Sequence, residues 1–580
     1  MLGEWKKMKW INKQKIKDGY FYPIAFVERV EKTEIECEAG SNSKNDSCNV
    51  IIQTKIGQGS FEADEKLIQN SGLDNSVWVG CLVEKDNKVK TIILKTQNKK
   101  EGPHELSQEL ANLFEKNGIS FSDIEKFPKN GITEGVIWQQ LLLFFFPMLF
   151  GTFFQQAYTT IDAIVVGQYV GKEALSAVGG TTGTLINLLV GFFVGMSTGA
   201  TVIISQFYGG KKYEEVGKAV HTAIALALSG GAAIMLIGLI VAPSVLAAMG
   251  TPNEIMPYSL TFIRIYFCGM IPNILYNMGA GILRAIGDSK RPLYFLIIST
   301  LTNVVLDLFF VLVLKLGVAG VSLATVLSQL LSAVLICLTL IKTRESYHLN
   351  IRSIKFHKNI LLRIIQIGLP TAFQSLMYTS SNVIIQSNIN RFGTDYIAAW
   401  TAYGKVDGLF GMVIGSFGIS VTTFIGQNFG AGKSERVKRG VKVGLSMAMG
   451  ITLCLSIVVF TFGIYVLQLF TNDAAVIEKG YEILQFLVPT YITYVCIEIF
   501  SGSLRGMGST LIPMLLTGLG VCAFRMVWNF IAVPVWPEFK TVIASYPISW
   551  ATTSILFIIY YNIYVRRKKV KSSERTIIIN

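Results

Sequence analysis

The chain has 580 residues, of which 51% are hydrophobic and 16% are charged. Soluble domains average about 25% charged residues, so this composition argues against an ordinary soluble protein and indicates one that spans a membrane. The net charge of +14 raises the question of a nucleic-acid partner. Because the Lys and Arg residues are scattered over many loops and are not clustered with aromatic residues, we expect no nucleic-acid partner.

Residues 1–131 differ in character from the rest of the chain. They contain short alternating runs typical of strands, so we expect a small soluble, cytoplasmic α+β appendage. The first 20 residues are rich in Lys and lack an apolar core, which predicts that no cleavable signal peptide is present. The predicted strands cover residues 24–30, 49–56, 76–83 and 89–95, and the predicted helix covers residues 104–117.

Twelve apolar blocks follow, such as 136–161 and 185–207, and each is long enough as a helix to cross about 30 Å of hydrocarbon. The sequence therefore predicts an all-α polytopic membrane protein with twelve transmembrane helices. We expect a first lobe over 132–342, an interlobe cytoplasmic linker over 343–363, a second lobe over 364–568 and a basic cytoplasmic tail over 569–580.

The distribution of basic residues predicts the orientation. With both termini inside, the inner loops and the tail carry 24 Lys and Arg residues, whereas the outer loops carry five. Since Lys and Arg collect in cytoplasmic loops, we expect a multi-pass protein of the bacterial inner membrane with both termini in the cytoplasm.

An internal repeat relates the two lobes at an offset of 221 residues. Gln206 and Gly209 correspond to Gln427 and Gly430, and the motif Leu-Arg-x-x-Gly at 283–287 recurs at 504–508. An even number of helices separates each feature from its copy, so the two six-helix lobes have the same orientation. We expect them to face each other across a central cavity.

Few carboxylates lie within the apolar blocks, where a charge is costly. Asp162 lies towards the end of the first predicted membrane helix. Asn303 and Asp307 lie four residues apart in the fifth block, so they project from one helical face, where an amide oxygen and a carboxylate can bind a proton or a small hard cation. The alternative is that Asp162 caps a helix and that Asp307 is a neutral packing residue.

The second lobe cannot contain the same site, because Phe524 and Trp528 occupy the positions equivalent to Asn303 and Asp307. Its acidic candidates are Asp407 and Glu498, each a second titrating group or part of a site for a cationic ligand. A position near a helix end is the alternative for Asp407. Arg525 needs a carboxylate or a water-filled cavity, and Glu498 is a candidate partner.

Glycines spaced by four residues, Gly191-x3-Gly195-x3-Gly199 and Gly411-x3-Gly415, predict close helix packing. The four histidines and eight cysteines form no metal-ligand motif, so we expect no metal beyond a Na⁺ at the coupling site. No Walker A sequence occurs, which argues against ATP as the energy source.

Several motifs together resemble the multidrug and toxic compound extrusion family over about residues 132–568. They are Asp162-x4-Gly167, Ala174-Leu-Ser-Ala-Val-Gly179, Asn303-x2-Leu-Asp307, Gly317-Val-x-Gly320 with Ala324-Thr325, and Gly426-Gln427-Asn428-x-Gly430-Ala431. The resemblance implies rocker-switch export driven by inward H⁺ or Na⁺. Similarity to the DNA-damage-inducible bacterial branch implies that Asp162, Asn303, Asp307 and Thr325 bind the coupling cation.

These observations predict a secondary antiporter, and not an enzyme, that exports cationic amphipathic compounds in exchange for H⁺ or Na⁺ without another cofactor. We expect it to function as a monomer in the lipid bilayer. Two alternatives stay open: a flippase for a lipid-linked saccharide or peptidoglycan precursor, and a membrane-anchored enzyme with catalysis in residues 1–131. The residues expected to line a substrate cavity are Gln155, Tyr158, Asn277, Gln374, Asp407 and Glu498.

Overall fold

The structure is a computed structural model that describes residues 14–16, 19–23, 30–37, 47–54, 57–64, 78–85, 88–95 and 132–577. The chain divides into two compact units, Met1–Asn130 and Gly131–Asn580.

The first unit contains a seven-stranded sheet with the order β1-β2-β6-β7-β5-β4-β3. Its neighbouring strands are antiparallel except for β5 and β7, which are parallel. The runs predicted at 49–56, 76–83 and 89–95 coincide with β4, β6 and β7, whereas β3 begins at Val30, where the predicted run ends. The predicted helix over 104–117 lies outside the described residues. The strands are β1 Gln14–Ile16, β2 Gly19–Pro23, β3 Val30–Cys37, β4 Ser47–Thr54, β5 Gly57–Asp64, β6 Trp78–Lys85 and β7 Lys88–Lys95.

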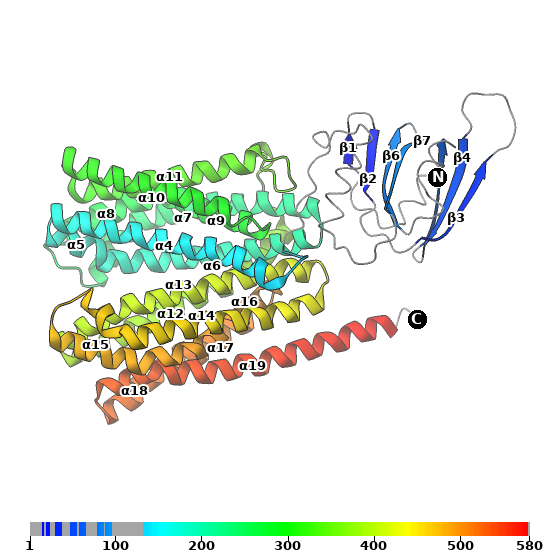
Figure 1. The fold of residues 1–580 in the computed structure, drawn as a ribbon. Helices are drawn as coiled ribbons and strands as arrows, with labels where there is room; N and C mark the ends of the chain where they lie inside the picture. Colours follow the sequence, from blue (N-terminus) through cyan, green and yellow to red (C-terminus); the bar gives the residue numbers. More distant parts are fainter. Residues whose placement is uncertain are drawn as a thin grey trace. The chain divides into compact units, whose positions relative to one another are not determined.

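The second unit is helical and consists of two halves that lie side by side, the first in cyan and green and the second in yellow to red (Figure 1). The helices of the first half are α4 Ile137–Tyr169, α5 Lys172–Gly179, α6 Thr181–Gly209, α7 Tyr213–Ala248, α8 Met256–Cys268, α9 Met270–Ala285, α10 Lys290–Leu308 and α11 Gly317–Lys342. A π-helical turn, η3 Phe309–Val313, extends α10.

The second half repeats this order after the short 3-10 turn η4, Ile351–Ser353. Its helices are α12 Lys358–Ile389, α13 Thr394–Gly430, α14 Ser434–Gln468, α15 Ala474–Leu487, α16 Tyr491–Gly506, α17 Leu511–Thr517, α18 Phe524–Val535 and α19 Phe539–Ile577. Short turns join or extend several of them: η5 Asn390–Phe392, η6 Val488–Thr490 and η7 Gly518–Ala523.

Eleven helical segments of the described chain are long and apolar enough to cross a membrane. α8 and α9 follow each other, separated only by Gly269, and lie at the repeat positions of α15 and α16, which together form one of these segments. By this equivalence α8 and α9 correspond to the remaining helix of the predicted twelve. The Gly269 N–H donates to the carbonyl of Tyr266, three residues back, so the helix tightens locally at this point. The predicted all-α polytopic fold is confirmed.

The first helix of each half begins in the apolar core of the other half. Leu141, Phe144 and Phe145 from the beginning of α4 belong to the buried apolar cluster of the second half. In the same way, Ile360 and Ile364 from the beginning of α12 belong to the buried cluster of the first half. The later part of α4 returns to first-half neighbours, so this helix connects the cores of both halves.

Glycines allow α6 and α12 to approach closely at the junction of the halves. A Cβ atom on Gly195 would lie 2.5 Å from the Cα of Ala372, and one on Gly199 would lie 2.4 Å from the carbonyl oxygen of Ile364. The packing role predicted for this run is confirmed. The same prediction is wrong for Gly411 and Gly415, where an added Cβ would meet no described atom within 4 Å.

Candidate functional site

Three helices of the first half bring four predicted residues together. Asp162 lies near the C-terminal end of α4, Asn303 and Asp307 lie one turn apart on α10, and Thr325 lies on α11. All four side chains are buried, with exposed fractions between 0% for Asp307 and 6% for Asp162. Because α10 packs against both α4 and α11, its amide and carboxylate meet residues that are far apart in the sequence.

The two carboxyl groups lie next to each other and interact electrostatically, with Asn303 beside Asp162. Thr325 Oγ1 is within reach of two acceptors, Asp162 Oδ2 at 3.4 Å and the carbonyl of Val321 at 3.0 Å. Among the described residues, Asp162 Oδ1, both side-chain atoms of Asn303 and both carboxyl oxygens of Asp307 have no hydrogen-bond partner. Buried polar atoms are rarely left in this state, so the cluster has unused capacity to coordinate a proton or a cation.

The helix geometry changes directly after this cluster. Regular α-helix ends at Leu308, one residue beyond Asp307, and five residues then wind as the π-helical turn η3. Such turns are rare and occur often at functional sites. The turn therefore marks Asp307 as a position where backbone regularity is lost beside a buried carboxyl group.

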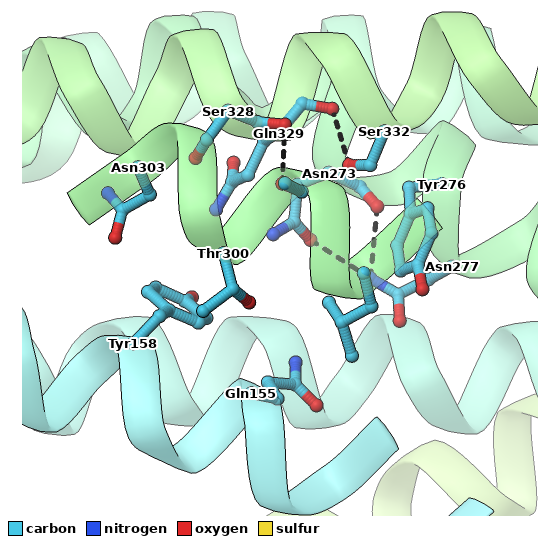
Figure 2. A pocket seen from close by; sticks show the side chains of 12 residues that line it. Gln155, Tyr158, Asn273, Tyr276, Asn277, Thr300, Asn303, Ser328, Gln329 and Ser332 are labelled. Atoms are coloured by element: carbon cyan, nitrogen blue, oxygen red, sulfur yellow. Dashed lines mark hydrogen bonds between the residues drawn. The ribbon is translucent and has the colours of Figure 1, made fainter. Parts of the chain in front are cut away.

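A polar cavity adjoins the cluster, and Asn303 belongs to both. Its volume of about 30 Å³ is enough for a water molecule or a small cation. Figure 2 shows side chains from α4, α9, α10 and α11 converging on it. Its twelve lining residues are all uncharged: Gln155, Tyr158, Asn273, Tyr276, Asn277, Leu296, Ser299, Thr300, Asn303, Ser328, Gln329 and Ser332.

Three of the predicted substrate-cavity residues, Gln155, Tyr158 and Asn277, line this cavity. Sequence reasoning missed others, notably Gln329, whose side-chain amide atoms have no hydrogen-bond partner among the described residues. The sequence did contain a pattern that could have identified these lining residues. Polar residues recur at a spacing of four on α9, α10 and α11, so they lie on one face of each helix. Examples are Asn273 with Asn277, Ser299 with Asn303 and Ser328 with Ser332.

The other three predicted cavity residues lie in the second half, outside this cavity. Gln374 Nε2 donates to Thr517 Oγ1 at 3.0 Å, which joins α12 to α17. Asp407 accepts hydrogen bonds from the hydroxyls of Tyr403 and Tyr491 within a buried aromatic cluster. The structure therefore separates these residues from the first-half cluster.

The predicted pairing of Glu498 with Arg525 is wrong. Glu498 Oε1 instead accepts from Arg505 Nη2 at 2.7 Å, because residues seven apart on α16 lie on the same face of the helix. Arg525 is buried, donates to Ser549 at 3.0 Å and stacks on the ring of Tyr546 at 3.9 Å. Aromatic faces therefore take the place of a carboxylate as the partner of this guanidinium.

The arrangement as a whole can bind one small cation or exchange protons. Two adjacent carboxylates that are removed from water cannot both remain charged without a proton or a counter-ion. The residues present fit Na⁺, which prefers carboxylate, carbonyl and hydroxyl oxygens, and they fit a proton equally well.

Comparison with known proteins is consistent with this geometry. A protein-family model described as MatE matches residues 147–309 and 370–531, one block in each half. A second model, described as lipid II flippase MurJ, matches residues 251–387.

Individual relatives are more distant. The chain is 27% identical over 442 residues to the probable multidrug resistance protein YoeA of Bacillus subtilis, a match that covers 75% of this chain and 95% of that protein. It is 24% identical over 384 residues to the multidrug export protein MepA of Staphylococcus aureus, a match that covers 65% of this chain and 84% of that protein.

Solved structures share the fold. A transporter of the MOP superfamily from Pyrococcus furiosus superposes with a TM-score of 0.72 at 22% identity, over 77% of this chain and all of the other. A multidrug resistance MATE family transporter in an outward-facing conformation gives the same TM-score, identity and coverage.

Proposed function

Because this chain belongs to the MatE family, whose model matches both of its halves, we propose that it is a secondary antiporter that exports cationic amphipathic compounds in exchange for H⁺ or Na⁺. One observation carries the assignment of the coupling site. The buried carboxyls of Asp162 and Asp307 lie side by side, and three of their oxygens have no hydrogen-bond partner among the described residues.

The coupling between cation binding and the conformation of the helices follows from the negative charge of the Asp162–Asp307 cluster. Two adjacent buried carboxyls carry a single negative charge when they share one proton, and a cation bound at this cluster neutralises that charge. Its departure leaves negative charge buried in the first half. Water or a substrate cation must then compensate that charge, which favours a different arrangement of the helices. Exchange results if the cation and the drug favour different arrangements, since a ligand shifts a conformational equilibrium only by its difference in affinity for the two states.

The cavity beside Asn303 supports a route between solvent and the carboxylates. Its amide and hydroxyl groups can replace the water shell of a small cation without adding fixed charge. Gln155, at its edge, is exposed, whereas Asp307 is completely buried. A cation therefore passes from hydrated to protein-bound surroundings along α4 and α10.

The orientation of the transporter is part of the proposal. The excess of Lys and Arg at the ends of α6, α9, α13 and α16 places these ends in the cytoplasm. Both chain termini are then cytoplasmic, and the protein resides in the bacterial inner membrane. A role for residues 1–131 and a monomeric state remain predictions.

The test is gradient-driven efflux of ethidium from vesicles that contain the wild type, Asp162→Asn, Asp307→Asn or Asp407→Asn. We expect both first-half variants to lose most of the gradient-driven efflux and Asp407→Asn to retain it, because Asp407 is held by two tyrosine hydroxyls. Collapsing the H⁺ and Na⁺ gradients separately identifies the ion. Unimpaired efflux in both first-half variants would refute the coupling site.

A lipid-linked precursor is the second candidate cargo, because the MurJ model matches residues 251–387. Its diphosphate would require a cationic cavity, yet the cavity beside Asn303 has only uncharged lining residues. Two of the intramembrane arginines have other partners, since Arg505 pairs with Glu498 and Arg525 stacks on Tyr546. Stimulation of lipid-linked precursor translocation in liposomes, without ethidium transport, would favour the flippase.

A further inference from the structure

Residues 132–135, which lie before Val136 and the start of α4, pack against the second half of the protein. We call residues 132–135 the strap. Its main-chain carbonyls accept hydrogen bonds from side chains at the end of α13, in the following turn and at the start of α14, about 300 residues further along the chain. Asn428 donates to Ile132 O at 3.2 Å, and Lys433 donates to Thr133 O at 3.0 Å.

Arg436 in the first turn of α14 makes the largest share of these contacts. Its planar guanidinium presents several N–H donors in a fixed fork, so one side chain can bind several carbonyls at once. Its four acceptors are Gly135 O at 2.8 Å, Glu134 O at 2.9 Å, Ile132 O at 3.3 Å and Gln140 Oε1 at 2.8 Å. Every carbonyl of the strap therefore has a side-chain donor from the second half.

The strap also lies beside a turn of the first half. The side chain of Ile132 is 6% exposed and belongs to the buried cluster of the second half. Its Cδ1 atom would lie 3.6 Å from a Cβ placed on Gly287, in the turn between α9 and α10. Gln427, next to Asn428, donates to the carbonyl of Ala285 at the same place. The strap thus lies at the junction of the two halves.

This junction is connected to the candidate cation site through α4. The beginning of α4 is held in the second-half core, where the ring of Phe145 stacks on that of Phe417 at a centroid distance of 4.0 Å. The same helix carries Asp162 near its other end. Whatever fixes the strap therefore fixes one end of the helix that bears the cation site.

We propose that Arg436 is a positioning residue of the transport cycle, which holds the strap in the conformation where the two halves meet at this end of the bundle. This inference rests on the proposed transport function. Since the strap is bonded to the second half and touches the first, separation of the halves here must break one set of contacts. Arg436 holds Ile132 where it meets the turn at Gly287, so loss of Arg436 releases the strap and weakens this contact between the halves. The population then shifts towards the state open at this end.

The experiment measures the distance between spin labels at Lys212 and Lys442, two exposed positions on different halves, in the full-length protein in lipid nanodiscs. We expect Arg436→Ala to increase the population of long distances relative to short ones by roughly tenfold, as loss of several hydrogen bonds from a charged donor implies. Arg436→Lys, with one ammonium group, should give an intermediate distribution. Arg439→Ala, an exposed neighbour on α14, is the matched control and should match the wild type.

Amide hydrogen exchange of the strap is the second measurement, made on the folded fraction after size exclusion. We expect faster exchange of residues 132–135 in Arg436→Ala and no change in α10. The inference would be overturned if Arg436→Ala left both the spin-label distance distribution and the amide hydrogen exchange of the strap unchanged. Equal changes in the distance distribution of Arg436→Ala and Arg439→Ala would also overturn it. Failure of the Asp162 and Asp307 variants to alter efflux would count against the coupling site and not against the strap.

Discussion

Gln206 and Gln427 make the same contact in opposite directions across the junction of the two halves. Gln206 Nε2 donates to the carbonyl of Gly506 at 2.8 Å, and Gln427 Nε2 donates to the carbonyl of Ala285 at 2.7 Å. Both donors and both acceptors are related by the 221-residue offset of the internal repeat. The repeat seen in the sequence therefore appears in the fold as a reciprocal pair of hydrogen bonds.

The close approach at these hydrogen bonds depends on glycine. A Cβ atom on Gly430 would lie 1.9 Å from the carbonyl oxygen of Gln206, too close for the backbones to stay in place. We expect Gly430→Ala to separate the halves at this end and to abolish most gradient-driven efflux. Gly411→Ala, on the same helix but facing open space, should leave efflux unchanged. Equal activity in both variants would contradict the close packing of the junction.

Thr325 offers a graded test of the cation site. Its hydroxyl lies 3.4 Å from Asp162 Oδ2, and Val has nearly the same shape without the oxygen. We expect Thr325→Val to weaken cation binding by about 3- to 10-fold, the effect of one ordinary hydrogen bond, because 3.4 Å is long for a hydroxyl–carboxylate contact, and Thr325→Ser to restore most of it. The apparent cation affinity of efflux is the readout. An unchanged affinity in Thr325→Val would exclude this hydroxyl from the site.

The ion pair of Glu498 with Arg505 predicts a stability effect. The side chains are 18% and 13% exposed, so neutralising one partner leaves the other charge poorly solvated. We expect Glu498→Gln to lower the free energy of unfolding by about 1–3 kcal/mol. The double variant Glu498→Gln/Arg505→Gln should lose less than the single variant, as judged by the melting temperature in detergent. A double variant that is less stable than the single one would argue against the pair.

His357 predicts a pH effect outside the membrane-spanning segments. Burial lowers its pKa from the usual value of about 6.5, and the positive charges of Lys355 and Lys218 act in the same direction. The unfolded chain therefore takes up this proton at a higher pH than the folded chain, and the contribution to stability is present above about 6.5 and lost as the pH falls below it. We expect His357→Gln to reduce the drop in melting temperature between neutral and mildly acidic pH. His348→Gln is the control, and equal changes in the two variants would contradict the effect.

The sequence was sufficient to predict the features that depend on hydrophobicity and spacing. Apolar blocks predicted the membrane helices, and the spacing of Asn303 and Asp307 predicted that they share a face of α10. Thr325 was identified only through family resemblance, because a threonine in a membrane helix usually bonds to its own backbone, as Thr325 also does with Val321. The positions of charged residues in the sequence did not indicate a role for Thr325.

Other features required the structure because they join distant segments without a sequence pattern. The pairing of Glu498 was assigned to Arg525 because both lie in apolar blocks, whereas Arg505 is nearer along the same helix. The contacts of Arg436 with the strap could not be predicted, since backbone carbonyls are acceptors at every position. The open space at Gly411 likewise depends on which face of α13 is turned towards a neighbour.

The most direct test of the account is cation binding to the purified protein, measured as ²²Na⁺ bound at equilibrium together with the protons released or taken up. The account predicts that the wild type and Asp407→Asn bind one coupling cation, Na⁺ or H⁺, and that Asp162→Asn and Asp307→Asn each lose that binding while retaining the wild-type fold. Binding of the cation at wild-type affinity in both Asp162→Asn and Asp307→Asn would contradict it.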